Sequence, residues 1–201
     1  MASQKLVQTL EIVTNEFREK QIPYSLIGAL ALGLYGAPRF TADIDILSEH
    51  SYCDLISSVM ENLGYTCYQK TKLFAQFDSE KGTFGRIDFI FVRTPEGKDI
   101  IKHSAMVDDE ILSNHPVIQP VDYIGLKLMA IANNPTRSLK DDSDILQLLQ
   151  VAEKGLLPPE FESPDRDRIY YYADRFGQRV RIDSIFHKLA EEDEPSEDFE
   201  I

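Results

Sequence analysis

The sequence predicts an α/β (α+β) fold, in which a small mixed β-sheet is flanked by helices and followed by a helical C-terminal part. Short apolar segments alternate with amphipathic ones up to about residue 119, and only the helical period follows. The chain has 201 residues, 43% of them hydrophobic, which is enough for a core. We therefore expect an α/β core over residues 1–118, a helical subdomain over 119–190 and a disordered acidic tail over 191–201.

The composition is acidic, with a formal net charge of −13. Residues 191–201 contain seven acids and no Lys or Arg, which is typical of a solvated tail. This charge disfavours a broad nucleic-acid surface but allows a local basic patch. Cys53 and Cys67 lack Cys-x-x-Cys spacing, and the chain has neither an apolar signal segment nor an 18-residue apolar run. We expect a soluble, cytoplasmic protein with no membrane partner.

Helices and strands are expected to alternate in the first part of the chain. Residues 4–20 have the period of an amphipathic helix, and residues 85–92 form an apolar run typical of a buried strand. Residues 99–113 are ambiguous, with a short helix followed by a turn as the interpretation. The remaining elements expected here are helices over 29–35 and 51–63, strands over 24–27 and 40–47, one or two strands over 65–77, and an edge strand over 117–119.

The second part is expected to contain helices over 121–132 and 139–154. Two more helices are expected over 164–190, with a break near Gly177. The Tyr170–Tyr172 run is interpreted as helix packing rather than as a surface on which bases stack.

Two aspartates lie two residues apart on the strand expected over 40–47. Because alternate strand residues share a face, Asp43 and Asp45 should point the same way, with Ile44 and Ile46 on the other face. Two carboxylates about 5 Å apart repel by about 3 kcal/mol at an effective dielectric near 20. The pair therefore indicates either a wet surface or a site for a cation, and we favour magnesium next to a nucleotide.

A glycine and a third aspartate flank this pair in the chain. Gly28 and Ala29 follow an apolar strand, where backbone amides could bind a phosphate. Asp88 lies in the apolar strand over 85–92, and a carboxylate there needs a partner. It could complete a two-metal site or accept the proton of an attacking hydroxyl. These interpretations have alternatives. Gly28 could be an ordinary turn glycine, and the aspartates could form an exposed strand face without a ligand.

Together these motifs resemble the nucleotidyltransferase superfamily that includes DNA polymerase beta. The resemblance covers about residues 20–92 and departs from the family pattern at Ala29, where a Ser or Gly is usual. It implies a nucleotidyltransferase-like fold, one or two Mg²⁺ ions on Asp43, Asp45 and Asp88, and phosphate binding at Gly28 and Ala29. The segments that carry it are Ile27-Gly28-Ala29, Asp43-Ile44-Asp45 and Arg86-Ile87-Asp88.

Two residues before the pair are expected in phase with it. Arg39 and Thr41 would share its strand face, and we expect both to bind nucleotide. An Arg at this place could donate two hydrogen bonds to a phosphate. A surface ion pair between Arg39 and the acids is the alternative.

The helical part contains Lys127 in an apolar helix and then Arg137-x-x-Lys140-Asp141-x-x-Asp144. A Lys in such a helix should extend its ammonium to water, pair with an acid or line a site. With these motifs the chain is similar to the AbiEii type of nucleotidyltransferase, the toxins of toxin–antitoxin systems. That resemblance implies that Lys127 contacts the nucleotide phosphates and that Asp144 or Asp141 orients it.

The sequence thus predicts a transferase that moves a nucleoside monophosphate from a nucleoside triphosphate to an acceptor. Asp43, Asp45, Asp88 and Lys127 are its expected catalytic residues. The acceptor stays open between an RNA 3′ end such as that of tRNA, a protein and a small molecule, and an antitoxin protein is a further expected partner. The alternative is an inactive binding or regulatory protein with the same fold.

Overall fold

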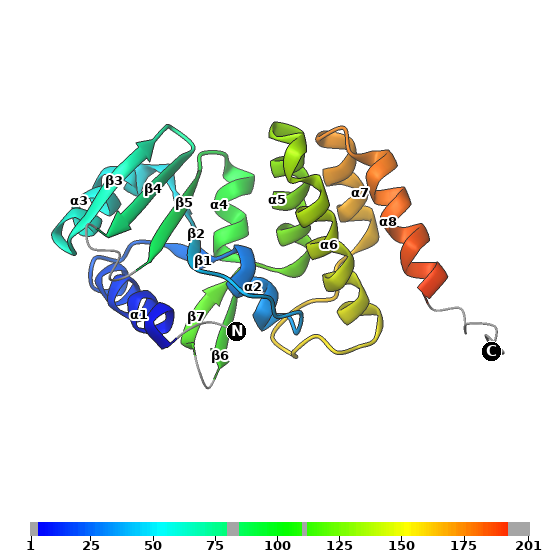
Figure 1. The fold of residues 1–201 in the computed structure, drawn as a ribbon, viewed down its shortest axis with the longest axis horizontal. Helices are drawn as coiled ribbons and strands as arrows, with labels where there is room; N and C mark the ends of the chain where they lie inside the picture. The colour runs from blue at the N-terminus through cyan, green and yellow to red at the C-terminus, as the bar shows by residue number, and fades with distance from the viewer. Residues whose placement is uncertain (1–3, 80–84, 110–111, 193–201) are drawn as a thin grey trace, which may run out of the picture. The chain divides into compact units, whose positions relative to one another are not determined.

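The computed structural model describes residues 4–79, 85–109 and 112–192. The chain forms two compact units, Met1–Gln119 and Pro120–Ile201. Among the described residues, the first unit mixes strands and helices, whereas the second contains helices alone (Figure 1). The α/β (α+β) class expected from the sequence is confirmed.

The first unit contains a seven-stranded mixed sheet within the described residues. Its strand order is β3-β4-β5-β2-β1-β7-β6. β2 pairs with β5 in parallel and with β1 antiparallel, and β1 pairs with β7 in parallel. The elements are α1 (Gln4–Glu19), β1 (Tyr24–Leu26), α2 (Gly28–Leu34), β2 (Asp43–Glu49), the 3₁₀ helix η1 (His50–Tyr52), α3 (Cys53–Asn62), β3 (Tyr65–Lys70), β4 (Phe74–Ser79), β5 (Arg86–Val92), α4 (Pro95–Lys102), β6 (Ala105–Asp109) and β7 (Ser113–Val117).

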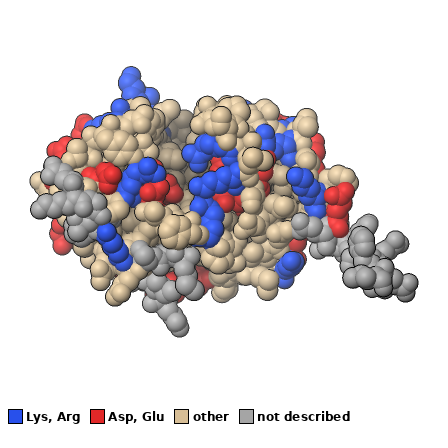
Figure 2. All heavy atoms as spheres, viewed as in Figure 1, with Lys and Arg blue, Asp and Glu red and all other residues tan. Residues whose placement is uncertain are grey.

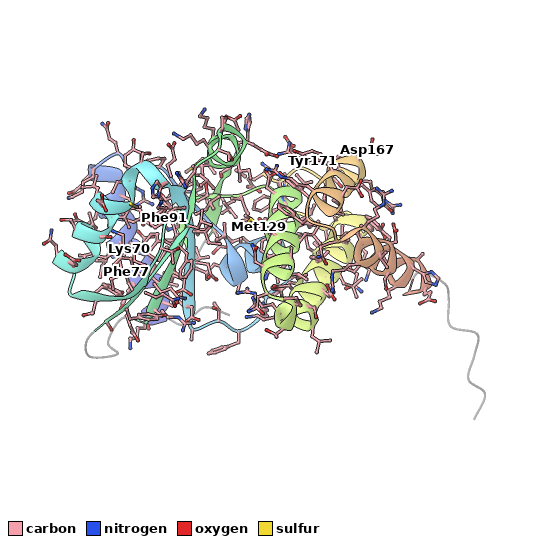
Figure 3. All side chains as sticks on the ribbon, turned by 90° about the horizontal axis from the view of Figure 1, so that it is seen from above. Lys70, Phe77, Phe91, Met129, Asp167 and Tyr171 are labelled. Carbon is pink, nitrogen blue, oxygen red and sulfur yellow. The ribbon has the colours of Figure 1, made fainter. Side chains whose placement is uncertain are left out.

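The core of this unit lies where α1 and α3 pack against the sheet (Figure 1). The ring of Phe17 on α1 lies 5.9 Å from that of Phe89, and Phe89 lies 5.7 Å from Phe77 on β4. Figure 3 labels Phe77 and Phe91, which belong to this buried face. Because alternate strand residues fill this core, the residues between them are left for the opposite face of the sheet.

Two expectations about strands are wrong. The strand expected at the edge over 117–119 is β7, and it lies between β1 and β6 rather than at an edge. The ambiguous segment 99–113 supplies β6, which pairs with β7 on its other side. The strand expected from Phe40 begins three residues later, at Asp43. The position of β7 depends on pairing between distant segments, which local periodicity does not contain.

The second unit is built around α5, which packs against α6 and α7. Gly125 lies so close to Tyr172 that an added Cβ would be 2.8 Å from its ring. On the same helix, Asp122 Oδ1 accepts hydrogen bonds from Arg168 at 2.8 Å and from the Tyr172 hydroxyl at 2.7 Å. The elements are α5 (Pro120–Asn133), the 3₁₀ helix η2 (Pro135–Arg137), α6 (Ser138–Glu153), α7 (Arg166–Arg175) and α8 (Arg179–Glu192).

The three consecutive tyrosines of α7 have different surroundings. Tyr172 is buried, and Tyr170 packs its ring 5.7 Å from that of Phe186 on α8. Tyr171, labelled in Figure 3, is 52% exposed and lies beside the guanidinium of Arg175. Tyr170 and Tyr172 therefore have the packing role expected from the sequence.

Both signs of charge are interspersed on the face that Figure 2 shows. α8 extends to Glu192, so the first two residues of the expected tail are helical, and residues 193–201 lie outside the described part of the chain. Cys53 and Cys67 are free thiols. Within the described residues, no helix combines the length and apolarity needed to cross a membrane.

Candidate active site

The site begins with the aspartate pair on β2. Asp43 and Asp45 are partly exposed on one face of this strand, whereas Ile44 and Ile46 are buried on the other. The strand alternates because Ile44 and Ile46 pack into the core. The two carboxylates consequently lie on the face of the sheet opposite the core.

β5 places the third aspartate beside this pair. It runs parallel to β2 in a register that pairs Asp45 with Asp88 and Asp43 with Arg86. Paired residues on neighbouring strands point to the same face and lie about 4.8 Å apart. The structure therefore brings Asp43, Asp45 and Asp88 together on one face. We call these three residues and Arg86 the carboxylate cluster.

Arg86 supplies a positive charge inside the carboxylate cluster. Its Nη2 donates a hydrogen bond to Asp43 Oδ2, and its Nε lies 3.5 Å from Asp88 Oδ1. Burial lowers the pKa of the guanidinium, but the charges of Asp88 and Asp43 and the hydrogen bond to Asp43 outweigh it, and the pKa is raised above its ordinary value. The side chain is 42% exposed.

Gln76 on β4 fixes the other side of Asp88. The register of β4 and β5 pairs these two residues, and Gln76 Nε2 donates to Asp88 Oδ2 at 3.0 Å. The two oxygens of Asp88 therefore face different partners, Gln76 and Arg86. Sequence reasoning did not select either residue. Arg86 could have been found, because it is two residues from Asp88 in a strand, whereas Gln76 depends on strand register.

The donor types of the carboxylate cluster fit magnesium, which prefers a few carboxylates together with oxygens of the substrate. Within the described residues, however, no three His, Cys, Asp or Glu side chains are grouped so that they could hold a metal ion. The guanidinium of Arg86 lies beside one oxygen of Asp43 and one of Asp88. One arginine thus pairs with two of the three carboxylates, and the cluster keeps a net negative charge.

Gly28 brings the backbone close to Asp45. Its φ of 64° lies in the left-handed region, and a Cβ at this position would be 2.6 Å from Cγ of Asp45. The backbone N–H of Ile27 also donates to the carbonyl of Asp45 at 3.1 Å. Only glycine fits here without displacing the Asp45 carboxylate. The side chain of Ala29 is buried, so its backbone N–H is the group that could meet a ligand.

Arg39 and Thr41 precede β2, so the expectation that they lie in strand phase with the aspartates is wrong. The Thr41 hydroxyl accepts from the N–H of Asp43 at 3.2 Å and lies 3.0 Å from its carbonyl oxygen. This local bond holds the chain in a bend just before the strand. Arg39 is partly exposed and donates to the carbonyl of Phe40 at 3.4 Å.

The second unit has its own buried charged cluster, around Lys127 on α5. The ammonium donates to Asp141 Oδ1 at 2.7 Å and to Asp144 Oδ2 at 2.6 Å. Asp141 also pairs with Arg137 at 3.1 Å, and the Tyr123 hydroxyl donates to Asp144 at 3.4 Å. We call these five residues the lysine cluster. The two cations balance the two carboxylates, and Asp141 and Asp144 orient Lys127 within this unit.

No protein-family model and no curated protein match the sequence. Solved structures do match the fold. The antibiotic-resistance factor ANT(2'')-Ia aligns with 90% of this chain and 96% of its own, with a TM-score of 0.61 at 11% identity. The fold is that of nucleotidyltransferases. A putative nucleotidyltransferase from Thermotoga maritima covers 70% of this chain and 93% of its own, with a TM-score of 0.53 at 15% identity.

A third similar structure is the lincosamide antibiotic adenylyltransferase LnuA. It covers 70% of this chain and 94% of its own, with a TM-score of 0.52 at 14% identity. All three identities are low, so these similarities establish the nucleotidyltransferase fold and not a particular family within it. The resemblance to the AbiEii type stays a prediction.

Proposed function

We propose that this protein is a magnesium-dependent nucleotidyltransferase that moves a nucleoside monophosphate from a nucleoside triphosphate to an acceptor hydroxyl or amine. The observation that carries the proposal is the register of β2 and β5, which pairs Asp45 with Asp88 on the face that also carries Asp43. Three carboxylates this close repel each other, and a magnesium ion bound between them would offset that repulsion.

Each member of the carboxylate cluster has a proposed part in this reaction. Asp43 and Asp45 hold magnesium, which offsets charge on the triphosphate and on the leaving pyrophosphate. Asp88 holds a second ion or accepts the proton of the acceptor hydroxyl. Gln76 keeps Asp88 oriented through its hydrogen bond. The backbone at Gly28 and Ala29 binds phosphate oxygens beside Asp45.

The proposed part of Lys127 is to donate to a phosphate of the nucleotide. Asp141 and Asp144 use two of the three donors of its ammonium, and a phosphate contact needs the third. The two carboxylates also offset the charge of Lys127. Its ammonium would therefore orient a phosphate through a directed hydrogen bond more than attract it through net charge. Arg39 remains a candidate phosphate ligand, whereas Thr41 holds the start of β2.

The acceptor is the least defined partner. One of the similar structures contains adenylyl-2''-tobramycin, and another contains lincomycin. We therefore propose that a small molecule with free hydroxyls is the first acceptor to test. An RNA 3′ end and a protein hydroxyl are tested beside it.

The direct experiment is a labelling reaction. The protein, magnesium and each α-labelled nucleoside triphosphate are incubated in turn with RNA, protein and small-molecule fractions of a cell extract. We expect label in one fraction, and its loss with Asp43→Asn. Asp108→Asn is the matched control, because Asp108 is an exposed strand aspartate of the same unit. Equal labelling by both variants would refute the catalytic proposal.

An inactive binding protein with this fold is the second candidate. Arg86 favours it, because a guanidinium already pairs with two of the carboxylates. Calorimetric titration with a nucleoside triphosphate and magnesium separates the two proposals. Binding without transfer in any fraction supports the inactive protein, whereas binding with Asp43-dependent transfer supports the enzyme.

We propose a toxin role for the enzyme on the resemblance to the AbiEii type alone. Controlled expression tests it in a bacterial host, with growth as the readout. A toxin should slow growth in the wild-type form and not as Asp43→Asn. Equal growth with both forms would leave the transferase proposal in place without the toxin role and its antitoxin partner.

A further inference from the structure

The carboxylate cluster already contains a bound cationic group, the guanidinium of Arg86. Arg86 Nη2 donates to Asp43 Oδ2, and its Nε faces Asp88 Oδ1 at 3.5 Å. Two carboxylates from different strands thus share one arginine. Strand register holds all three side chains on one face, so the contact is built into the pairing of β2 with β5.

A metal ion and this guanidinium need the same oxygens. Asp43 Oδ2 and Asp88 Oδ1 carry the negative charge that would attract a divalent cation, and both face Arg86. A divalent ion and a guanidinium bound to the same two carboxylates would also repel each other.

The guanidinium is able to leave the carboxylate cluster. The side chain of Arg86 is 42% exposed, and those of Asp43 and Asp88 are 33% and 21% exposed. Ion pairs this open to solvent are weak, and a long flexible side chain can turn into water. Arg86 therefore differs from Lys127, whose ammonium is buried between its carboxylates.

We propose that Arg86 is a built-in competitor of the metal, which occupies the carboxylate cluster when no metal is bound and must turn away before a divalent cation binds. This inference rests on the proposed metal-dependent function. It makes Arg86 a positioning residue, because the guanidinium pairs with Asp43 and Asp88 when no metal is bound and thereby lowers the apparent metal affinity. If the arginine-bound arrangement outnumbers the open one by about ten to one, the metal affinity falls about tenfold.

The test measures metal binding without nucleotide. Mn²⁺ is titrated into wild-type protein, Arg86→Gln and Arg93→Gln, and free Mn²⁺ is followed by its paramagnetic resonance signal. Arg93 directly follows the other end of β5 and is exposed, so its loss removes the same charge at a distance. We expect Arg86→Gln to bind Mn²⁺ about tenfold more tightly than Arg93→Gln does. Equal affinities of the two variants would overturn the inference.

Asp43→Asn separates this outcome from failure of the proposed function. If Mn²⁺ binds the wild type and Asp43→Asn weakens it, the metal site stands, and the two arginine variants decide the role of Arg86. If Mn²⁺ binds neither the wild type nor Arg86→Gln, the proposed metal site itself is wrong. The same holds if Asp43→Asn leaves the Mn²⁺ affinity unchanged, and in either case this inference is wrong as well.

A second measurement uses the wild-type chain, in case Arg86→Gln does not fold. The Nε–H signal of Arg86 is followed by NMR while diamagnetic Mg²⁺ is added. The inference predicts that this signal moves to the position of a solvated guanidinium as metal binds. A signal that keeps its paired position at saturating Mg²⁺ would show that the arginine and the metal bind together, which overturns the competition.

Discussion

Gly28 shows how one residue can determine the position of a neighbouring side chain. Its backbone has a φ of 64° and lies against the carboxylate of Asp45. A larger residue would have to displace that carboxylate, and the proposed metal ligand with it. The glycine before the aspartate pair is thus required by the contact with Asp45 as well as by the turn.

Replacing Gly28 tests this close approach. Gly28→Ala places a Cβ against Asp45, and we expect a loss of about 1–3 kcal/mol from overpacking beyond the backbone cost. Gly64→Ala is the control, because Gly64 also has positive φ, at 82°, and has nothing within 4 Å of an added Cβ. Urea unfolding and Mn²⁺ binding are measured for both. If Gly28→Ala loses no more stability than Gly64→Ala and keeps Mn²⁺ affinity, the close approach is unimportant.

Lys127 is a buried charge whose partners are also buried. Its side chain is 9% exposed, and those of Asp141 and Asp144 are 0% and 2% exposed. Removing the lysine would leave two carboxylates in a poorly solvated place, with Arg137 beside only one of them. The stabilising role of Lys127 is therefore separable from its proposed role at the nucleotide.

We expect Lys127→Met to lower the free energy of unfolding by about 3–5 kcal/mol, the cost typical of breaking a buried ion pair. Lys140→Met is the control, since Lys140 is exposed on α6 in the same unit. The free energy of unfolding of the wild type and both variants is measured by denaturant titration of the full chain. A loss below 1 kcal/mol, as expected for exposed pairs, would show that water reaches the lysine cluster after the change.

At the scale of elements, β7 is joined to α1 and β1 by a buried histidine. His115 is 1% exposed, its Nδ1 lies 3.1 Å from the Tyr24 hydroxyl, and its Nε2 lies 3.4 Å from Glu11 on α1. Burial and, less strongly, the charge of Arg18 lower the pKa of His115 below 6.5, although Glu11 acts in the opposite direction. The folded state thus prefers the neutral ring.

This preference gives a pH dependence with a definite sign. Below pH 6.5 the histidine takes a proton more readily in the unfolded chain than in the folded one, so stability falls as the pH decreases through this range. We expect the free energy of unfolding to drop from pH 7 to pH 5, and His115→Gln to flatten that part of the curve. His187→Gln, at an exposed position of α8, should not. Parallel curves for all three proteins would contradict the assignment.

At the scale of the whole molecule, the formal net charge of −13 affects how strongly the protein binds polyanions such as RNA. A protein that neutralises many phosphates loses affinity steeply as salt increases, because counterions are released. An acidic protein repels a long RNA and has few such contacts to lose. If RNA is the acceptor, it should be bound at its 3′ end.

We expect the affinity for a long RNA to change little with salt. Fluorescence anisotropy between 50 and 200 mM salt should give a log–log slope near zero, rather than about −0.7 per phosphate contact for single strands. A short RNA that offers the same 3′ end is the control, and it should bind equally well. A slope of about −4 or steeper would reveal a basic surface that the net charge conceals.

Much of the proposed site follows from short-range patterns. The alternation of Asp43, Ile44, Asp45 and Ile46 predicted which side chains share a face, and the structure agrees. Arg86 was not selected from the sequence, although the same alternation places it on the face of Asp88, two residues away. The start of β2 was predicted three residues too early, because the hydrogen bonds of Thr41 to Asp43 hold the chain in a bend before the strand.

The sequence by itself determined the fold class, the helical period of the second part and the strand faces that carry the aspartates. These features repeat every two or 3.6 residues, so they can be read locally. Only the tertiary structure decided that Arg86 lies opposite Asp43, that Gln76 holds Asp88, and that Lys127 is bound by Asp141 and Asp144. Strand register and helix packing make these contacts, and both depend on which distant apolar faces bury one another.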